Sequence, residues 1–117
     1  MGPVDGQRDY IEFEINMNDT YLPTQPVEGE VIVTNHYSAP LSEVFHVKIY
    51  KDEKLVQEST TNAKDLMPGK TTFTLQEFGL PVIHGAQVSD QGNWTISIHQ
   101  RDRAHAQEAK FQVVSSI

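Results

Sequence analysis

The stretch from Gly92 to Ile98 constrains the fold more than any other part of the chain, because it contains the only tryptophan, Trp94. Apolar and polar residues alternate along it, so that Trp94, Ile96 and Ile98 point to one side and the residues between them to the other. A period of two is typical of a β-strand with one buried face. An indole ring brings a large apolar area into a core. We therefore expect the hydrophobic core to close around Trp94.

The same alternation recurs in shorter stretches and predicts further strands along the chain. They are expected over residues 10–17, 27–34, 43–51, 55–59, 71–76 and 109–115. Turn-forming residues such as Pro68 and Gly69 separate these stretches, and no run of about ten residues has a helical period. About seven short strands divided by turns predict an all-β fold, an antiparallel two-sheet immunoglobulin-like sandwich.

The length of the chain, 117 residues, is that of one domain with an ordinary core. We expect residues 1–8 to form a flexible leader and residues 9–117 to form a single β-sandwich domain. The start of the chain lacks the apolar stretch of a signal peptide. No apolar run reaches the length of a membrane-spanning helix, so the sequence predicts no membrane span.

Charge and cysteine content narrow the range of functions. The chain has 16 acidic and 9 basic side chains and a formal net charge of −7. Nucleic acids and anionic membranes attract basic surfaces, so neither is expected as the main partner. The absence of cysteine excludes thiol chemistry, disulfides and cysteine-ligated zinc.

Histidines are the first candidates for a metal site. They are His36, His46, His84, His99 and His105. Zinc needs three or four ligands that converge on one point, and His99 and His105 flank the last predicted hairpin, with His46 on a neighbouring exposed face. No HxH or HExxH spacing supports such a site. Solvent-facing histidines are the favoured interpretation, so we expect no metal and no cofactor.

Acidic side chains on the outward faces of the first two strands raise the question of acid–base chemistry or calcium binding. They are Glu12, Glu14, Glu28 and Glu30. Glycosidase chemistry needs a cleft and two carboxylates with separated pKa values, which nothing in the sequence indicates. No serine lies in a GxSxG elbow, and no glycine-rich phosphate loop is present. We interpret the glutamates as a solvated face and predict no catalytic residue and no enzyme activity.

Two N-x-[ST] triplets are candidate glycosylation sites, at Asn18 and Asn93. Asn18 is expected in a turn, where it would be an accessible acceptor. Asn93 begins the Trp94 strand and is the poorer candidate, because its neighbour is expected to be buried. The triplets favour an extracellular or cell-surface location, with a cytoplasmic location as the alternative.

The least regular part of the sequence, residues 78–91, is unusually apolar for a loop. Its apolar residues are Phe78, Leu80, Val82, Ile83 and Val88, together with Pro81. Exposed apolar patches mark contacts with partners or ligands, so these five side chains are the candidate partner or ligand contact. The alternative, which we favour, is that part of the segment caps one end of the sandwich or includes another irregular strand.

Several short motifs together resemble the macroglobulin-like domains of the alpha-2-macroglobulin and complement family. The motifs are Tyr21-Leu22-Pro23, Gly29-Glu30-Val31, Phe45 to Tyr50, Gly92-Asn93-Trp94-Thr95-Ile96 and Phe111-Gln112-Val113. The family's entry usually continues from proline to glycine, whereas Thr24 follows Pro23 here. The resemblance implies an immunoglobulin-like fold and a scaffold or interaction role, with no active site.

A single sandwich of this length is also similar to the lipid-recognition domains of the MD-2-related group, which hold a lipid between their sheets. Those domains usually carry disulfides, which this chain lacks. We predict a non-enzymatic module for protein interaction or structural assembly, with a protein partner. The alternative is a sandwich that binds a lipid or another small molecule in an apolar pocket near Trp94, and a third hypothesis is a metal-dependent enzyme or hydrolase.

Overall fold

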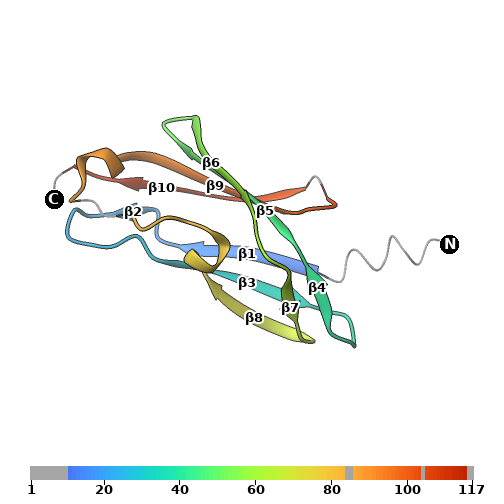
Figure 1. Ribbon diagram of the computed structural model, residues 1–117. Coiled ribbons are helices and arrows are strands. Elements are labelled where there is room, and N and C mark those ends of the chain that lie inside the picture. Colours follow the sequence, from blue (N-terminus) through green and yellow to red (C-terminus); the bar gives the residue numbers. More distant parts are fainter. Residues whose placement is uncertain (1–10, 84–85, 104, 116–117) are drawn as a thin grey trace.

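The fold is described from a computed structural model, which defines residues 11–83, 86–103 and 105–115 (Figure 1). Within these ranges the chain forms ten strands and two 3-10 helices, and no α-helix. The strands are β1 (Ile11–Met17), β2 (Thr20–Tyr21), β3 (Gly29–Asn35), β4 (Leu41–Glu43), β5 (Phe45–Lys51), β6 (Lys54–Thr60), β7 (Lys64–Leu66), β8 (Gly69–Thr74), β9 (Gly92–Gln100) and β10 (Ala106–Val113). The 3-10 helices are η1 (Gln76–Phe78) and η2 (Val88–Asp90). The predicted leader, residues 1–8, lies outside the described ranges.

Two sheets face each other and enclose the core (Figure 1). One has the strand order β1-β3-β8, and the other has the order β2-β10-β9-β5-β6. A separate two-stranded sheet pairs β4 with β7. This arrangement confirms the predicted all-β, immunoglobulin-like sandwich.

Trp94 lies in the core, as its strand pattern predicts, and is only 6% exposed. Its ring stacks on Phe111 of β10, with ring centroids 6.0 Å apart and an interplanar angle of 4°. The indole Nε1–H donates a hydrogen bond to the Asp90 carbonyl oxygen at 2.8 Å. The polar end of the ring is thus satisfied while its apolar area is buried.

The other core side chains come from alternating positions on the strands of both sheets. The buried ones include Val31, Val33, Phe45, Val47, Ile49, Ile96, Ile98, Phe111 and Val113. Phe13, Ile15 and Met17 of β1 are half-buried against them. The predicted inward rows of the strands at 10–17, 27–34 and 43–51 are therefore confirmed, because each strand has one face toward the core.

One strand pairing differs from the antiparallel prediction. After β1 the chain crosses to the other sheet, where β2 pairs in parallel with β10, Thr20 opposite Gln112 and Tyr21 opposite Val113. A strand of two residues is too short to show an alternating pattern, so no sequence signal predicts it.

The predicted strand over residues 43–51 is two strands, β4 and β5, with Val44 between them. β4 pairs with β7, a strand that the sequence did not predict. The buried amide of Asn35 ties this pair to the end of β3, because its Nδ2 donates to the carbonyl oxygens of Ala39 and Leu66, each at 3.0 Å. A local sequence pattern does not predict a side-chain hydrogen bond between residues so far apart in the chain.

The hairpin between β5 and β6 turns through Asp52 and Glu53, and both residues have positive φ, 50° and 69°. Hydrogen bonds join this turn to the start of β9. The Asp52 N–H donates to the Asn93 carbonyl oxygen at 2.7 Å, and Asp52 Oδ1 accepts from the Asn93 N–H at 3.0 Å. Gly92, with φ of 141°, lies so near that an added Cβ would be 2.9 Å from the Asp52 carboxylate.

Candidate functional site

The irregular segment between β8 and β9 contains all five predicted contact residues, and the structure separates them into two groups. Phe78, Leu80 and Ile83 are buried in the core and offer no surface to a partner. Val82 and Val88 are 67% and 79% exposed. The favoured interpretation, that part of the segment caps the sandwich, therefore fits the first three residues, and only two valines remain as candidate surface contacts.

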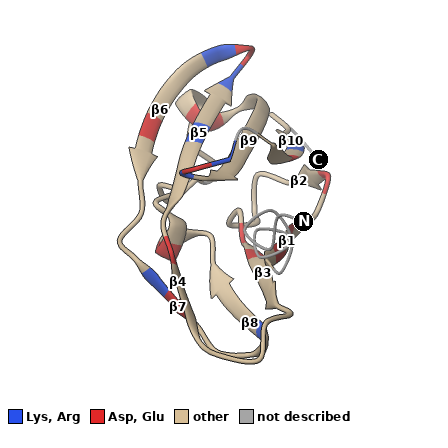
Figure 2. Ribbon diagram, turned by 90° about the vertical axis from the view of Figure 1, so that its right-hand side faces the viewer, with Lys and Arg blue, Asp and Glu red and all other residues tan. Residues whose placement is uncertain are grey.

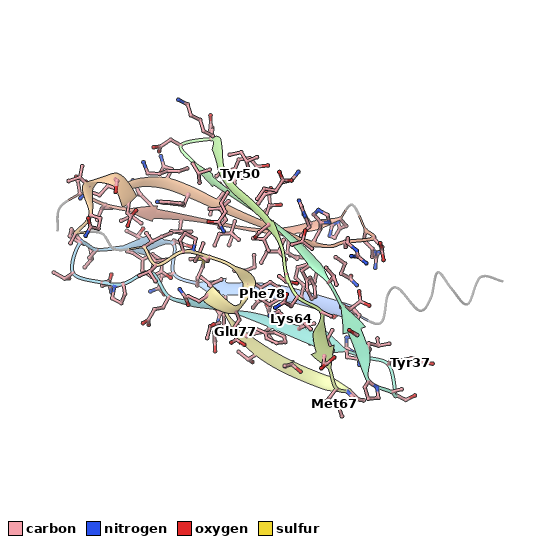
Figure 3. All side chains as sticks on the ribbon, viewed as in Figure 1. Tyr37, Tyr50, Lys64, Met67, Glu77 and Phe78 are labelled. Atoms are coloured by element: carbon pink, nitrogen blue, oxygen red, sulfur yellow. The ribbon has the colours of Figure 1, made fainter. Side chains whose placement is uncertain are left out.

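Aromatic packing anchors the start of this segment. The Phe78 ring lies 5.1 Å from that of Phe45 and 5.5 Å from that of Phe73, between ring centroids. Lys64 Nζ lies 5.6 Å from the centroids of both Phe73 and Phe78 and donates to the Glu77 carbonyl oxygen at 2.9 Å (Figure 3). A cation over two ring faces and a backbone hydrogen bond together hold η1 against β7 and β8.

Backbone and side-chain hydrogen bonds fix the rest of the segment. Thr74 and Glu77 form a reciprocal pair: Thr74 N–H donates to Glu77 Oε1 at 2.9 Å, and Glu77 N–H donates to Thr74 Oγ1 at 3.2 Å. The Thr74 N–H lowers the pKa of the Glu77 carboxyl group. Further along, Val27 N–H donates to the Ile83 carbonyl oxygen at 3.0 Å. The exposed Val82 therefore lies next to a residue that is fixed by both burial and a hydrogen bond.

Two of the histidines considered as metal ligands lie next to each other in the structure. His46 on β5 and His99 on β9 are directly opposite in the antiparallel ladder, and their ring centroids are 5.2 Å apart. His46 also contacts Glu58 of β6, with Nε2 and Oε2 2.7 Å apart. The hydrogen bond from His46 lowers the pKa of the Glu58 carboxyl group.

The remaining histidines lie elsewhere. His105, considered with His99 as a candidate metal ligand, lines a groove beside β1 together with Glu12 and Arg103. His36 Nε2 lies 3.1 Å from Glu12 Oε2, and His84 is outside the described ranges. Among the described residues, no group of three or more His, Asp or Glu side chains is arranged to hold a metal ion.

The four glutamates of the first two predicted strands are all exposed, on the outer face of the three-stranded sheet or next to it. Glu14 is opposite Ile32 and Glu30 is opposite Asn16, so the register does not pair one carboxylate with another across the two strands. Glu28 precedes β3 and accepts a hydrogen bond from Tyr21 only through its carbonyl oxygen. The arrangement agrees with a solvated face.

Both asparagines of the N-x-[ST] triplets are exposed. Asn18 lies between β1 and β2, and its N–H donates to the Tyr21 hydroxyl oxygen at 2.9 Å. Asn93 is part of β9, where it is opposite Gln112 of β10. Because Asn18 lies between strands and Asn93 lies within a paired strand, a glycosylating enzyme could bind the backbone around Asn18 more easily.

Open clefts occur at the surface, and polar side chains line much of them. One, of about 620 Å³, lies beside Asn16, Asn18, Gln25, Glu28 and Gln76. Another, about 570 Å³, reaches Trp94 and Phe111, and its other walls include Asp19, Asp52, Glu53 and Lys110. The lining of this second cleft differs from the apolar pocket that a lipid would need.

Comparison with solved structures supports the fold. The CARDB domain of PF1109 from Pyrococcus furiosus has a TM-score of 0.58 and 17% sequence identity, over 92% of this chain and 96% of that domain. A β-glucosidase from Listeria innocua in complex with gluconolactone has a TM-score of 0.53 and 14% identity, over 92% of this chain but 17% of that protein. A β-glucosidase involved in saponin metabolism from intestinal bacteria has a TM-score of 0.53 and 16% identity, over 89% of this chain and 16% of that protein.

The sequence comparisons assign no family, because no family model and no curated protein matches the chain. The structural matches are too distant in sequence to indicate more than a shared immunoglobulin-like β-sandwich. Within the described ranges, no helix has the length and apolar composition needed to cross a bilayer.

Proposed function

We propose that the chain is a non-enzymatic immunoglobulin-like module that binds a protein partner or acts as a structural unit in a larger assembly, outside the cell or at its surface. The observation that carries the proposal is the exposure of Val82 and Val88 on a segment whose Phe78, Leu80 and Ile83 are buried in the core. Loops at the end of a rigid sandwich are a common place for binding residues, and exposed apolar side chains on them favour contact with another protein.

The anchoring of the segment supports this proposal physically. Binding costs free energy when a loop has to be ordered in the complex. Phe78, Leu80 and Ile83 already fix the backbone on either side of Val82. A partner would therefore meet preformed apolar side chains and would lose less free energy to ordering.

Site-specific photocrosslinking tests the proposal. A benzoylphenylalanine at position 82 or 88 should give a discrete crosslinked protein when the chain is expressed in its own host. The control places the same group at Met67, which is 61% exposed between β7 and β8, at the opposite end of β8 from this segment. Crosslinks of equal yield at all three positions, or at none, would contradict a contact through the two valines.

The macroglobulin-like relationship belongs to the same proposal. Three of the motif pieces that carry the resemblance lie within strands: Gly29-Glu30-Val31 in β3, Gly92 to Ile96 in β9 and Phe111 to Val113 in β10. This placement supports a related sandwich, because each motif has a core-facing residue in it. The corresponding function would be that of a scaffold.

Lipid or small-molecule binding is the alternative outcome, and Trp94 provides its test. The cleft of about 570 Å³ next to Trp94 is the place where such a ligand would enter. Because its walls carry Asp52, Glu53 and Lys110, we expect Trp94 fluorescence to be unchanged by fatty acids or phospholipid vesicles. A saturable blue shift with one lipid class would favour the carrier function instead.

A further inference from the structure

The three-stranded sheet has an edge strand, β1, whose other side is not paired. Among the described residues β1 pairs only with β3, which lies between β1 and β8 (Figure 1). The register with β3 runs from Ile11 to Met17 without a shift, so the edge has no bulge, and the strand contains no proline. Bulges and prolines are features that keep an edge strand from pairing with another chain. This edge is therefore open to an added strand.

One hydrogen bond fixes the direction of the backbone groups on β3. The Leu75 N–H donates to the Gly29 carbonyl oxygen at 3.3 Å, on the β8 side of β3. In an antiparallel ladder consecutive residues direct their N–H and C=O groups to opposite sides of the strand. Gly29, Val31 and Val33 therefore bond to β8, and the residues between them bond to β1.

The same alternation leaves a row of unbonded backbone groups on the free side of β1. Glu12 and Glu14 are opposite Thr34 and Ile32, the residues of β3 that bond to this strand. The N–H and C=O groups of the intervening residues point away from β3, and no described residue bonds to them. These residues are Ile11, Phe13 and Ile15. An added strand would satisfy their backbone groups.

The side chains along this edge alternate in kind. Phe13 and Ile15 point to the core but are only half-buried, whereas Val31 and Val33 on β3 are 0% and 1% exposed. Glu12 and Glu14 point to the outer face and are exposed. Beside residues 11–14 lies a groove of about 580 Å³, whose opposite wall is formed by Gln100, Arg103, His105 and Gln107. An extended segment there meets apolar surface on one face and carboxylates on the other.

The carboxylates determine which kind of strand fits. A second copy of β1, paired antiparallel about Phe13, would place Glu12 of each copy opposite Glu14 of the other. Like charges directly opposite each other destabilise a sheet, whereas a lysine or arginine opposite each glutamate stabilises it. The net charge of −7 also attracts a basic segment. The edge therefore disfavours a second copy of itself and favours a basic partner.

We propose that the free side of β1 binds an extended peptide of a partner protein, in which lysine or arginine alternates with apolar residues. The peptide extends the three-stranded sheet as a further strand, antiparallel to β1. Its basic side chains pair with Glu12 and Glu14, and its apolar side chains cover Phe13 and Ile15. The contact does not depend on the one proposed for Val82 and Val88, because it uses other residues.

Hydrogen exchange on the unchanged chain tests the site, with a heptapeptide that alternates valine and lysine and has valine at both ends. In the free chain the amides of Phe13 and Ile15 should exchange fast and that of Glu14 slowly, because only Glu14 is bonded to β3. Saturating peptide should slow exchange at Phe13 and Ile15 by about tenfold or more and change Glu14 little.

Two control peptides separate strand pairing from charge. The same heptapeptide with N-methylated valines keeps its charge but lacks the N–H groups that would bond to β1, so it should not bind. A heptapeptide of alternating valine and glutamate should not bind either, because its carboxylates would lie opposite Glu12 and Glu14.

Charge reversal on the chain provides the matched variants. Glu12→Lys combined with Glu14→Lys should lower the affinity for the lysine peptide by about tenfold and allow the glutamate peptide to bind. Glu28→Lys combined with Glu30→Lys changes the net charge by the same amount away from the free edge, and should lower the affinity by no more than about twofold.

The proposal is wrong if the lysine peptide does not bind at about 1 mM, if the N-methylated peptide binds equally well, or if protection appears only elsewhere. Protection of Phe13 and Ile15 in the free chain at every concentration would mean that the chain itself covers the edge. Protection that increases with protein concentration would mean that a second copy does. Either result would overturn the proposal.

Discussion

At the crossing between the two sheets, the buried Tyr21 ring packs edge-on against Phe111, with ring centroids 5.8 Å apart. Its hydroxyl group donates to the Glu28 carbonyl oxygen at 2.6 Å and accepts from the Asn18 N–H at 2.9 Å. One side chain thus satisfies two backbone groups in the connections on either side of β2. A pairing of only two residues in β2 needs such support, because its own ladder is so short.

Tyr21→Phe should remove both hydrogen bonds and keep the ring. Since the Asn18 N–H and the Glu28 carbonyl group lose their partner in a partly buried position, the free energy of unfolding should fall by about 1–3 kcal/mol. Urea unfolding followed by Trp94 fluorescence measures the change. The control is Tyr50→Phe, at a half-buried tyrosine on the outer face (Figure 3), which should change stability by less than about 0.5 kcal/mol. Equal losses in the two variants would contradict this role for Tyr21.

The same tyrosine predicts a loss of stability in alkaline solution. Burial is the main cause that raises the pKa of Tyr21 above its usual value of 10.0. The unfolded chain therefore releases this proton at a lower pH than the folded chain does. The contribution to stability is complete below about pH 10 and is lost as the pH rises through the folded pKa. The free energy of unfolding, measured from pH 8 to 11, should fall more steeply for the unchanged chain than for Tyr21→Phe; parallel curves would refute the prediction.

Glycosylation is a further test at the scale of residues. If the chain is expressed through a secretory pathway, we expect a glycan at Asn18 and little or none at Asn93, because Asn93 lies within the β9 ladder. Thr20→Ala should then abolish the mass shift that a glycosidase removes, and Thr95→Ala should leave it unchanged. The reverse result would show that the position in the strand does not protect Asn93.

Among the elements, the β5–β6 hairpin contains the clearest local conflict between sequence and conformation. Its two-residue turn needs positive φ at both positions, a conformation for which Asn-Gly or Asp-Gly is preferred. The chain has Asp52 followed by Glu53. The unfavourable conformation of Asp52 is offset by a hydrogen bond that its carboxylate accepts from the Asn93 N–H. The same hydrogen bond is the main cause of the lowered pKa of Asp52. Glu53 has no comparable hydrogen bond in the described part of the chain.

Glu53→Gly should therefore stabilise the protein. A glycine adopts the observed φ of 69° without strain, and removal of the left-handed penalty should raise the free energy of unfolding by about 1 kcal/mol, less the entropy that glycine adds to the unfolded chain. Thermal unfolding monitored by circular dichroism measures the shift.

Gly92→Ala serves as the control, because it should change the melting temperature in the opposite direction. Its φ of 141° disfavours alanine, and the added Cβ would approach the Asp52 carboxylate to 2.9 Å. The melting temperature should fall, in contrast to the rise expected for Glu53→Gly. A fall in both variants would mean that the turn conformation at Glu53 is not strained.

The elements also show where prediction from the sequence succeeds. Long alternating stretches such as the one around Trp94 predict both a strand and its buried face. The three buried anchors and two exposed valines of the β8–β9 segment could not be separated, because a loop has no period that relates Val82 to its buried neighbour Ile83. The sequence could place His46 only on an exposed face neighbouring His99, because their direct contact depends on the register between β5 and β9, which no local pattern specifies.

At the scale of the whole molecule, the five-stranded sheet ends in an edge, β6, which could pair with another chain. Leu55 and Val56 on this strand are 49% and 55% exposed. The edge is protected in two ways. The register between β5 and β6 shifts at Ile49 and Tyr50, which marks a bulge, and charged segments of both signs lie along the hairpin (Figure 2). Bulges and charges on edge strands oppose intermolecular pairing.

Loss of the charges on β6 should therefore promote self-association. Lys54→Thr combined with Glu58→Thr leaves the net charge of −7 unchanged and keeps residues that favour strands. Besides the edge charges, it removes the hydrogen bond between His46 and Glu58. Sedimentation velocity over a range of concentrations should show larger species for this variant than for the unchanged chain. The matched control is Lys48→Thr with Glu30→Thr, because β5 and β3 each have neighbours on both sides. Association of both variants to the same extent would point to a general loss of surface charge, and no association of the edge variant would mean that the bulge alone protects β6.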